Sequence, residues 1–218
     1  MNTKIILEQI FKAAVQSVLP GKMIRDQVSV SDSTLAISNL PFSLNDIDCI
    51  YIIGAGKASA LMAKEIESIL GKHITEGHVV AKYGHSCELK HIKVTEAGHP
   101  IPDNNSVMAA GKILEIANKA SANDIVICLL SGGGSALLAD CPDGITLAEI
   151  IILNNLLLKT GADIKEINTV RKHLSKVKGG QLAKAVYPAT LIGLILSDVV
   201  GDSIDVIVSG PTAHDSTI

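Results

Sequence analysis

The pattern of apolar and polar positions along the chain predicts an α/β protein. Residues 125–130 form a continuous apolar run, and similar short runs cover residues 49–53 and 190–196. Apolar runs of this length without alternation are typical of strands buried on both faces of a parallel sheet. Between these runs, apolar residues recur every three or four positions, which is the spacing of helices with one buried face.

The order of the predicted elements indicates a mostly parallel sheet covered by helices on both faces. Pro20 and Gly21 are expected to end the first helix, and weak alternation within residues 26–40 predicts a small hairpin. Further strands are predicted at residues 79–82, 92–95 and 205–208, and helices at residues 3–18, 58–70, 103–119, 146–159, 163–177 and 181–185. Ligands bind such sheets beyond the carboxyl ends of the strands, near a switch in strand order.

Composition narrows the class of protein and its partners. Of the 218 residues, 47% are hydrophobic and 2% are aromatic, so we expect an aliphatic core. The net charge of −3 and the scattered lysines argue against nucleic acid as a partner. No apolar run reaches the roughly 18 residues of a membrane span, and no signal-type apolar core opens the chain. We therefore expect a protein that binds small molecules and no membrane.

Two further expectations concern compartment and completeness. The four cysteines form no C-x-x-C pair, which indicates a reducing compartment and a cytoplasmic protein. The chain stops in a polar stretch shortly after Gly210 and Pro211. We therefore expect a fragment or the first domain of a longer protein. The sequence does not indicate an oligomeric state, and a homodimer is compatible with it.

A glycine-rich loop after the apolar run at residues 125–130 is the strongest functional signal. It reads Ser131, Gly132, Gly133, Gly134 and Ser135, followed by a segment able to open a helix. Glycines allow a tight turn and close approach to a ligand, and a helix N-terminus presents free N–H groups to phosphate. The alternative is a tight turn without a ligand, because short glycine motifs often match by chance.

A second glycine loop follows the run at residues 49–53. Gly54 and Gly56 precede Lys57, but the third glycine of a dinucleotide fingerprint is replaced by Ser59, and the P-loop spacing is absent. Lys57 would place a cation at the start of a helix, where a phosphoryl group can be held. The alternative is a solvent-facing helix lysine.

Two residues at other strand ends are candidates for catalysis. Asp198 follows the run at residues 190–196, where a carboxylate can hold Mg²⁺ or accept a hydroxyl proton; Asp202 competes for this role, and both also suit a turn. His99 lies in a loop after a predicted strand, where it either contacts the substrate or shapes the loop. The other histidines lack the spacing of a zinc site, and no G-x-S-x-G elbow indicates a hydrolase.

A basic helical stretch offers a further candidate anion site. Asn168, Arg171 and Lys172 share a helix face by their spacing, and Arg171 is able to clamp an anion through two hydrogen bonds. The simpler interpretation is a solvated charged face.

Five segments, in this order, resemble the glycerate 2-kinase family. They are Gly54–Ala58 (GAGKA), Gly98–Asp103 (GHPIPD), Ser131–Leu138 (SGGGSALL), Asn168–Ala183 (NTVRKHLSKVKGGQLA) and Ser197–Thr212 (SDVVGDSIDVIVSGPT). Each motif alone is modest, but five in sequence are specific. The resemblance identifies residues 1–218 as the N-terminal domain, without the C-terminal domain called MOFRL.

The resemblance implies both a fold and a reaction. Members have a Rossmann-like three-layer α/β/α N-terminal domain, and they transfer the γ-phosphoryl group of ATP, with Mg²⁺, to the 2-hydroxyl of D-glycerate. The family's catalytic lysine falls on Lys57, and the loop Ser131–Ser135 would hold phosphate. Asp198 as the group that positions Mg²⁺ or the acceptor hydroxyl is our own inference.

Two other functions remain open at this stage. An NAD(P)-dependent hydroxypyruvate reductase would use the strand–GAG–helix start, but Lys82 and Tyr83 stand where such an enzyme places an acidic residue to bind ribose. A non-catalytic domain that binds phosphate or a sugar acid would use the same loops without chemistry.

Overall fold

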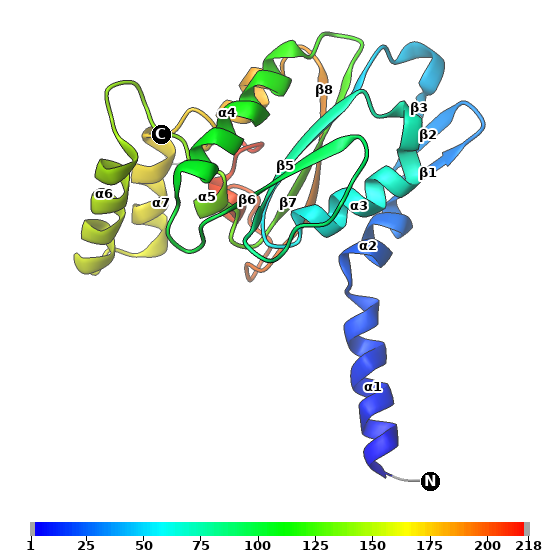
Figure 1. The fold of residues 1–218 in the computed structure, drawn as a ribbon, viewed down its shortest axis with the longest axis horizontal. Coiled ribbons are helices and arrows are strands. Elements are labelled where there is room, and N and C mark those ends of the chain that lie inside the picture. Colours follow the sequence, from blue (N-terminus) through cyan, green and yellow to red (C-terminus); the bar gives the residue numbers. More distant parts are fainter. Residues whose placement is uncertain (1–2, 216–218) are drawn as a thin grey trace.

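The computed structural model describes residues 3–215 and has a five-stranded parallel sheet between layers of helices (Figure 1). The strand order is β6-β5-β4-β7-β8. The strands are β4 (Ile50–Ala55), β5 (Glu76–Lys82), β6 (Ile92–Ala97), β7 (Ile125–Ser131) and β8 (Thr190–Leu196). The predicted three-layer α/β/α architecture is therefore confirmed.

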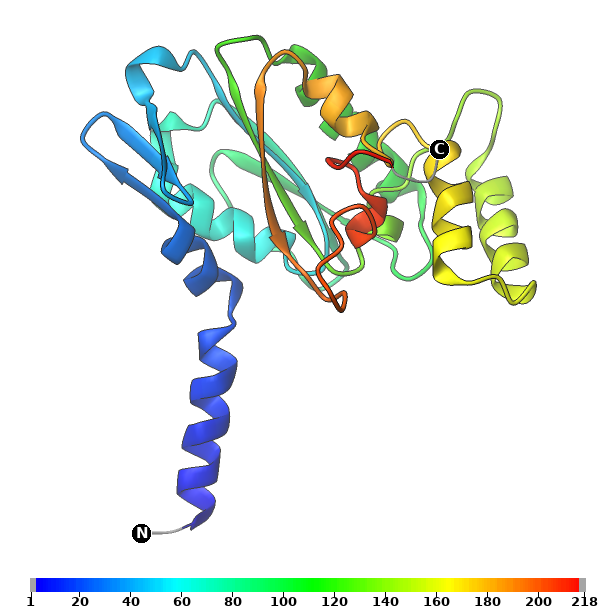
Figure 2. The same ribbon diagram turned by 180° about the vertical axis from the view of Figure 1, so that it is seen from behind.

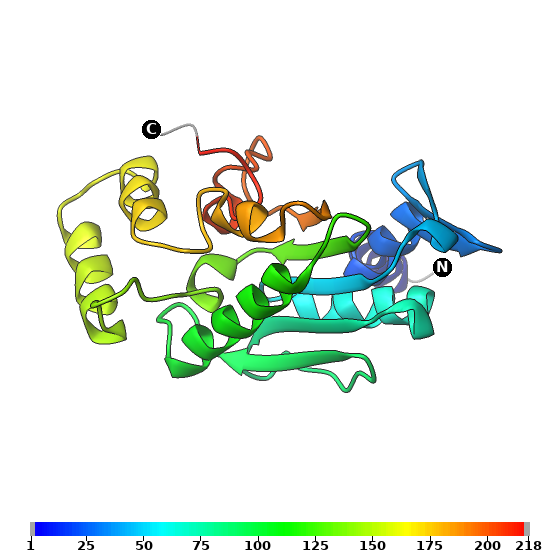
Figure 3. The ribbon, with the colours of Figure 1, turned by 90° about the horizontal axis from the view of Figure 1, so that it is seen from above.

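Some of the helices in the described residues cover the two faces of this sheet. The α-helices are α1 (Thr3–Ser17), α2 (Pro20–Gln27), α3 (Ser59–Leu70), α4 (Asn104–Lys119), α5 (Gly134–Leu137), α6 (Leu147–Lys159), α7 (Ile164–His173) and α8 (Gln181–Val186). Helices α2 and α3 pack on one face, and α4 and α8 pack on the other. Seen from above, α6 and α7 lie at one end of the sheet and the small sheet β1–β3 lies at the other (Figure 3).

Strand β4 shows why a continuous apolar run marks a central strand. Ile50 and Ile52 join the core on the α3 side, whereas Tyr51 and Ile53 join the core on the α4 side. Successive side chains of a strand point to opposite faces, so a strand covered on both faces needs an apolar residue at every position. Every residue of β4 and of β7 is buried.

The topology contains one reversal of direction. The chain builds outward from β4 to β5 and β6, and it then crosses to the other side of β4 to form β7 and β8. The carboxyl ends of β4 and β7 therefore flank the switch point of the sheet, which is where open α/β sheets bind ligands. Both glycine loops follow these two strands.

The hairpin predicted within residues 26–40 is present and has a third strand. The small antiparallel sheet consists of β1 (Val28–Ser31), β2 (Thr34–Ile37) and β3 (Leu40–Ser43). Leu35 and Ile37 are buried and join the core beneath α3.

Near the chain ends, the structure adds a helix that the sequence did not predict and contradicts one predicted strand. Pro20 and Gly21 do end the first helix, but Pro20 also opens α2, because proline has no N–H to lose and suits the first turn. The strand predicted at residues 205–208 is instead a loop and a short 3₁₀ turn, Ile207–Ser209. Val208 and Ser209 have φ of 55° and 62°, in the left-handed region that no strand adopts. This segment passes beside α8 and α5 (Figure 2).

Helix α1 extends away from the rest of the molecule (Figure 1). Within residues 3–215, nothing buries a side chain of α1, and several of its large apolar side chains are exposed. Phe11, for example, is 70% exposed. No helix in the described part of the chain is long and apolar enough to cross a membrane.

Deletion of residues 1–18 is expected to leave the unfolding temperature unchanged, because folding stability comes mainly from buried apolar area. Thermal unfolding followed by circular dichroism measures this. Ile24→Ala in α2 is the control, because Ile24 is 4% exposed and its truncation is expected to cost about 2–4 kcal/mol. A deletion that destabilises the protein as much as Ile24→Ala would show that α1 packs on the body.

Candidate active site

The candidate site lies where four strands of the parallel sheet end. Lys57 follows β4, His99 follows β6, Gly132 and Gly133 follow β7, and Asp198 follows β8. A Cβ atom added at Gly133 would lie 2.7 Å from His99 Nε2 and 2.8 Å from Lys57 Cε. A Cβ atom at Gly132 would overlap Asp198 Oδ2. The loop after β7 thus brings together the predicted site residues Lys57, His99 and Asp198, whose side chains lie directly against its glycines.

Hydrogen bonds join the two glycine loops into one unit. The Lys57 N–H donates to the Gly132 carbonyl oxygen at 3.0 Å, and the Ala58 N–H donates to Ser131 Oγ at 3.0 Å. Ser59, which replaces the third glycine of a dinucleotide fingerprint, places its Oγ 2.8 Å from Gly56 O and 2.7 Å from Val80 O. These contacts fix the start of α3 on both neighbouring strands.

Gly54 and Gly56 have packing roles in the structure. Both are buried, and a Cβ atom at Gly54 would overlap the Leu129 carbonyl oxygen. Gly56 has φ of +141°, and a Cβ there would lie 2.5 Å from Ser131 O and overlap Ser131 Oγ. Close approach of β4 to β7 therefore explains these glycines, and their contact with phosphate stays a prediction.

The helix expected after the glycine loop at residues 131–135 is a single turn. Helix α5 has four residues, so it contributes little of the dipole that a longer helix offers an anion. Beneath it, a Cβ at Gly134 would lie 2.7 Å from Val208 Cγ2, and Ser135 Oγ lies 2.9 Å from Ser209 Oγ. The left-handed Val208 and Ser209 therefore support the loop from below, which the sequence did not indicate.

The electrostatics around Lys57 favour a neutral His99. Partial burial lowers the pKa of His99, and the nearby cations Lys57 and Lys82 lower it further. The neutral imidazole leaves Lys57 as the positive charge beside Gly133. Lys57 itself is exposed, so its ammonium group is accessible to a ligand.

Asp198 is exposed beside Gly132, with no hydrogen bond or ion pair to another residue of the described range. Asp202 lies in an exposed turn at φ of 50°, where its N–H donates to Val199 O. The structure therefore brings Asp198 rather than Asp202 to the glycine loop. Residues 3–215 contain no cluster of three side chains able to hold a metal ion.

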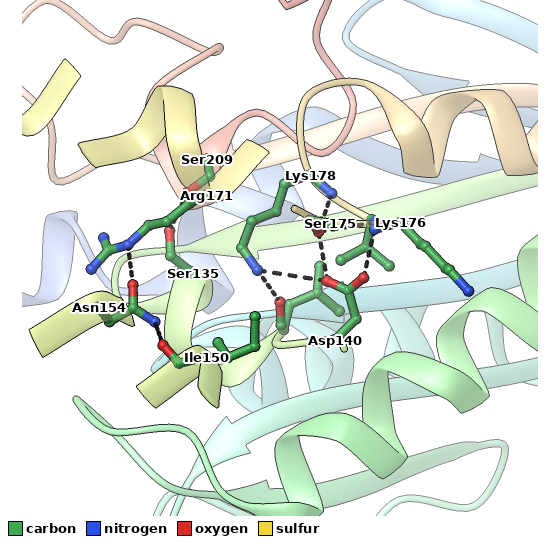
Figure 4. A network of polar contacts seen from close by, with 11 residues as sticks. Ser135, Asp140, Ile150, Asn154, Arg171, Ser175, Lys176, Lys178 and Ser209 are labelled. Atoms are coloured by element: carbon green, nitrogen blue, oxygen red, sulfur yellow. Dashed lines mark hydrogen bonds and ion pairs between the residues drawn. The ribbon is translucent and has the colours of Figure 1, made fainter. Parts of the chain in front are cut away.

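The basic face of α7 is not the solvated surface that the sequence favours. Lys172 is 4% exposed and its Nζ lies 3.1 Å from Asp215 Oδ1. Arg171 is partly buried, and its Nε donates to Asn154 Oδ1 of α6 at 2.7 Å (Figure 4). Lys172 thus anchors the last described residues, while Arg171 is held in place by α6.

Lys178, which precedes the glycine pair Gly179 and Gly180, is a buried cation. Its Nζ donates to the Leu138 carbonyl oxygen at 2.8 Å and lies 3.9 Å from Asp140 Oδ1 (Figure 4). Asp140 also accepts hydrogen bonds from Ser175 Oγ and the Lys176 N–H, both at 2.5 Å. Burial lowers the pKa of Lys178 to about 8, because desolvation outweighs the attraction of Asp140.

The free energy of unfolding is expected to rise between about pH 8 and pH 10.5, and Lys178→Met is expected to remove much of that rise. The pKa of Lys178 is lowered to about 8 in the folded protein, so the unfolded chain binds more protons in this window. Deprotonation of Lys178 contributes on the order of 3 kcal/mol to this rise in the free energy of unfolding. Urea unfolding at several pH values measures it. Lys176→Met is the control, because the Lys176 side chain is 50% exposed. If the free energy of unfolding changed with pH in the same way for Lys178→Met and for the parent chain, the pKa of Lys178 would not be lowered by burial.

The chain is thus an open parallel α/β domain with two joined glycine loops at the switch point of its sheet. The sequence matches the family described as Domain of unknown function (DUF4147) over residues 6–218. The chain belongs to this family, the N-terminal domain of glycerate 2-kinases.

Named relatives agree with this membership. A glycerate 2-kinase of Pyrococcus horikoshii is 48% identical over 94% of this chain and 45% of its own length. A D-glycerate 2-kinase of Thermotoga maritima is 44% identical over 96% of this chain and 47% of its own length. A relative from Agrobacterium vitis, 42% identical over the whole chain and 46% of its own length, carries the name hydroxypyruvate reductase.

Solved structures match the fold. A crystal structure of a Pyrococcus horikoshii protein has a TM-score of 0.90 and 46% identity, covering 99% of this chain and 48% of that one. The crystal structure of a Thermotoga maritima glycerate kinase has a TM-score of 0.83 and 42% identity, covering 95% of this chain and 47% of that one. The chain thus spans about half the length of the relatives that it matches.

Proposed function

We propose that this chain is the N-terminal half of a glycerate 2-kinase site, which transfers the γ-phosphoryl group of ATP to the 2-hydroxyl of D-glycerate. The observation that carries the proposal is the contact of Lys57 with the glycine loop at the switch point, where His99 and Asp198 also converge. The names of the relatives support the same reaction. Phosphoryl transfer depends mainly on positioning and on stabilisation of charge, which a loop, a cation and a carboxylate can supply.

Lys57 neutralises charge on the transferring phosphoryl group. Its Cε lies over Gly133, and its side chain is exposed at the carboxyl end of β4. A cation fixed beside the phosphate stabilises the developing charge in the transition state more than the ground state. Gly132, Gly133 and Ser135 hold the neighbouring phosphate oxygens, while Ser131 and Gly134 are buried and shape the loop.

Asp198 fits as a ligand of Mg²⁺. Magnesium in kinases is bound by one or two carboxylates together with phosphate oxygens and water, so a lone accessible carboxylate beside the phosphate loop suffices. The ion would shield the charge of the phosphates. His99, which is neutral and next to Lys57, makes a hydrogen bond with the acceptor hydroxyl of the substrate. Arg171 supplies a second cation that can bind an anionic group of a ligand.

A reductase is disfavoured by the end of β5. Lys82 and Tyr83 occupy the place of the acidic residue that binds ribose in dinucleotide enzymes. Nearby Glu96 accepts the N–H groups of residues 84–86, and Asp103 accepts the Tyr83 hydroxyl, so both carboxylates have structural partners. A cytoplasmic location and a homodimer belong with this proposal as expectations.

An enolase-coupled assay tests the proposal. The chain, alone and mixed with the second half of the Pyrococcus relative, is supplied with ATP, Mg²⁺ and D-glycerate. We expect phosphoenolpyruvate to appear, because enolase acts on 2-phosphoglycerate. Formation of 3-phosphoglycerate, or reduction of hydroxypyruvate by NADPH without any ATP-dependent product, would contradict it. Binding of ATP without product in either mixture would favour the non-catalytic alternative.

A further inference from the structure

A cavity of about 330 Å³ opens from the glycine loop toward α6 and α7. Gly133, Ser135 and His99 line its inner end, where the proposed phosphoryl-transfer site lies. Its far wall is formed by α6 and α7 and by the loop after His99. Its charged lining residues are Asp140, Arg171 and Lys178.

The cavity is much larger than the acceptor requires. The volume of the cavity equals that of about eleven water molecules, at roughly 30 Å³ for each molecule in the liquid. D-glycerate has only seven non-hydrogen atoms, so it would fill only part of this volume. Cavities of roughly 300 Å³ or more typically bury ligands of drug size. A nucleoside is of that size.

The chemistry of the far wall also fits a flat, weakly polar ring. Most of the lining side chains are aliphatic, which suits a purine ring and does not suit a three-carbon hydroxy acid. The polar lining groups include the amides of Asn154 and Asn155, the guanidinium of Arg171 and the ion pair of Lys178 with Asp140. Fixed polar groups on a mostly apolar wall are the usual composition of a site that orients its ligand.

Arg171 is fixed in orientation at this wall. Its Nε is bound to Asn154 Oδ1, and Asn154 Nδ2 in turn donates to the Ile150 carbonyl oxygen at 2.9 Å (Figure 4). An arginine has five N–H donors, so the bond from Nε leaves the two terminal nitrogens for a ligand. A planar guanidinium held in this way can stack on a ring or bind a phosphate oxygen.

We propose that this cavity binds the nucleoside part of ATP, with the triphosphate extending along Ser135 and Gly133 to Lys57. The inference rests on the proposed kinase function and adds the place and the orientation of the nucleotide. It leaves D-glycerate on the exposed side of the loop, next to His99 and Asp198. The apolar face of α6 that lines the cavity thereby has a role in nucleotide affinity.

Calorimetric titration with two probes in the presence of Mg²⁺ tests this placement. ATP carries the nucleoside, whereas inorganic tripolyphosphate offers the same chain of phosphates without it. We expect ATP to bind about tenfold or more tightly than tripolyphosphate, because ring burial adds apolar contact. Leu153→Gln is expected to weaken ATP about fivefold or more and to leave tripolyphosphate unchanged.

Two further variants distinguish the loss of a cavity contact from a general loss of folding stability. Ile152→Gln changes the neighbouring residue of α6, which is 57% exposed and does not line the cavity, and it is expected to alter neither affinity. Leu158→Gln is a second test at the rim of the cavity, where the side chain is 63% exposed and folding does not depend on it. It is expected to weaken ATP selectively, as Leu153→Gln does.

Three outcomes would overturn this inference alone. Equal affinities for ATP and tripolyphosphate would mean that the nucleoside makes no contact, and equal losses for both probes in Leu153→Gln would mean that the cavity does not discriminate. If Leu153→Gln weakened the binding of D-glycerate and left the affinity for ATP unchanged, the cavity would be the site of the acceptor substrate. These results leave the kinase proposal intact, whereas failure of both phosphate probes to bind would overturn the kinase proposal and this inference together.

Discussion

Gly56→Ala is expected to remove most of the folding stability of the chain. Gly56 has φ of +141°, a conformation that alanine adopts only with strain, and a Cβ there would lie 2.5 Å from the Ser131 carbonyl oxygen. Strain of this kind costs about 1–3 kcal/mol, and overpacking against backbone adds about 1–3 kcal/mol more. Gly56 directly follows β4 and lies against Ser131 at the end of β7, so an added methyl group would meet backbone that belongs to the sheet. Urea unfolding is the measurement.

The matched control is Gly144→Ala. Gly144 also has a positive φ, 82°, but a Cβ there would meet nothing within 4 Å. Its substitution is expected to lower the free energy of unfolding only by the backbone strain of a positive φ, about 1–2 kcal/mol. Equal losses for the two variants would show that β4 and β7 do not approach as closely at Gly56 as the structure has them.

Lys57→Ala is expected to lower the rate of phosphoryl transfer by about a thousandfold or more while the protein stays folded. Loss of one preformed electrostatic contact to a transition state typically costs two to three orders of magnitude, and a cation at the transferring group lies at the upper end. The side chain is exposed, so its truncation leaves the core unchanged. Initial rates in the enolase-coupled assay measure the effect.

Two variants sharpen the Lys57 result. Lys64→Ala removes an exposed lysine of α3 and is expected to leave the rate unchanged. Lys57→Arg keeps the charge but changes its geometry, so partial activity is expected. A rate for Lys57→Ala within a few-fold of the parent chain would remove Lys57 from the mechanism.

The strands of the sheet were predictable because their pattern is local. Every residue of β4 and of β7 is buried, and each of these strands therefore appears as an uninterrupted apolar run. β8 lies at the edge of the sheet, where Leu194 is buried and its other residues are partly or fully exposed. The stop of the first helix was predictable from Pro20, but the start of α2 was not, because proline has the same local signature in both roles. The strand predicted at residues 205–208 failed because its apolar residues are buried in a loop against α5.

The site was predictable as a set of strand ends and not as a set of contacts. Glycine loops and single polar residues after apolar runs identified Lys57, His99 and Asp198, which the structure brings together. The bond from the Ala58 N–H to Ser131 Oγ joins residues 73 positions apart, and no local pattern encodes it. Burial of Lys178 and the orientation of Arg171 by Asn154 likewise depend on tertiary packing.

The affinity of Mg²⁺-bound ATP for the chain carrying Gly133→Ala tests the central claim most directly. A Cβ at Gly133 would lie against both His99 Nε2 and Lys57 Cε, so it would separate the loop from the lysine while leaving the core unchanged. If the loop and Lys57 hold the phosphates as one unit, calorimetry should show saturable binding to the parent chain, weakened about tenfold or more in both Gly133→Ala and Lys57→Ala. Parent-like affinity in both folded variants would show that ATP does not bind at this loop.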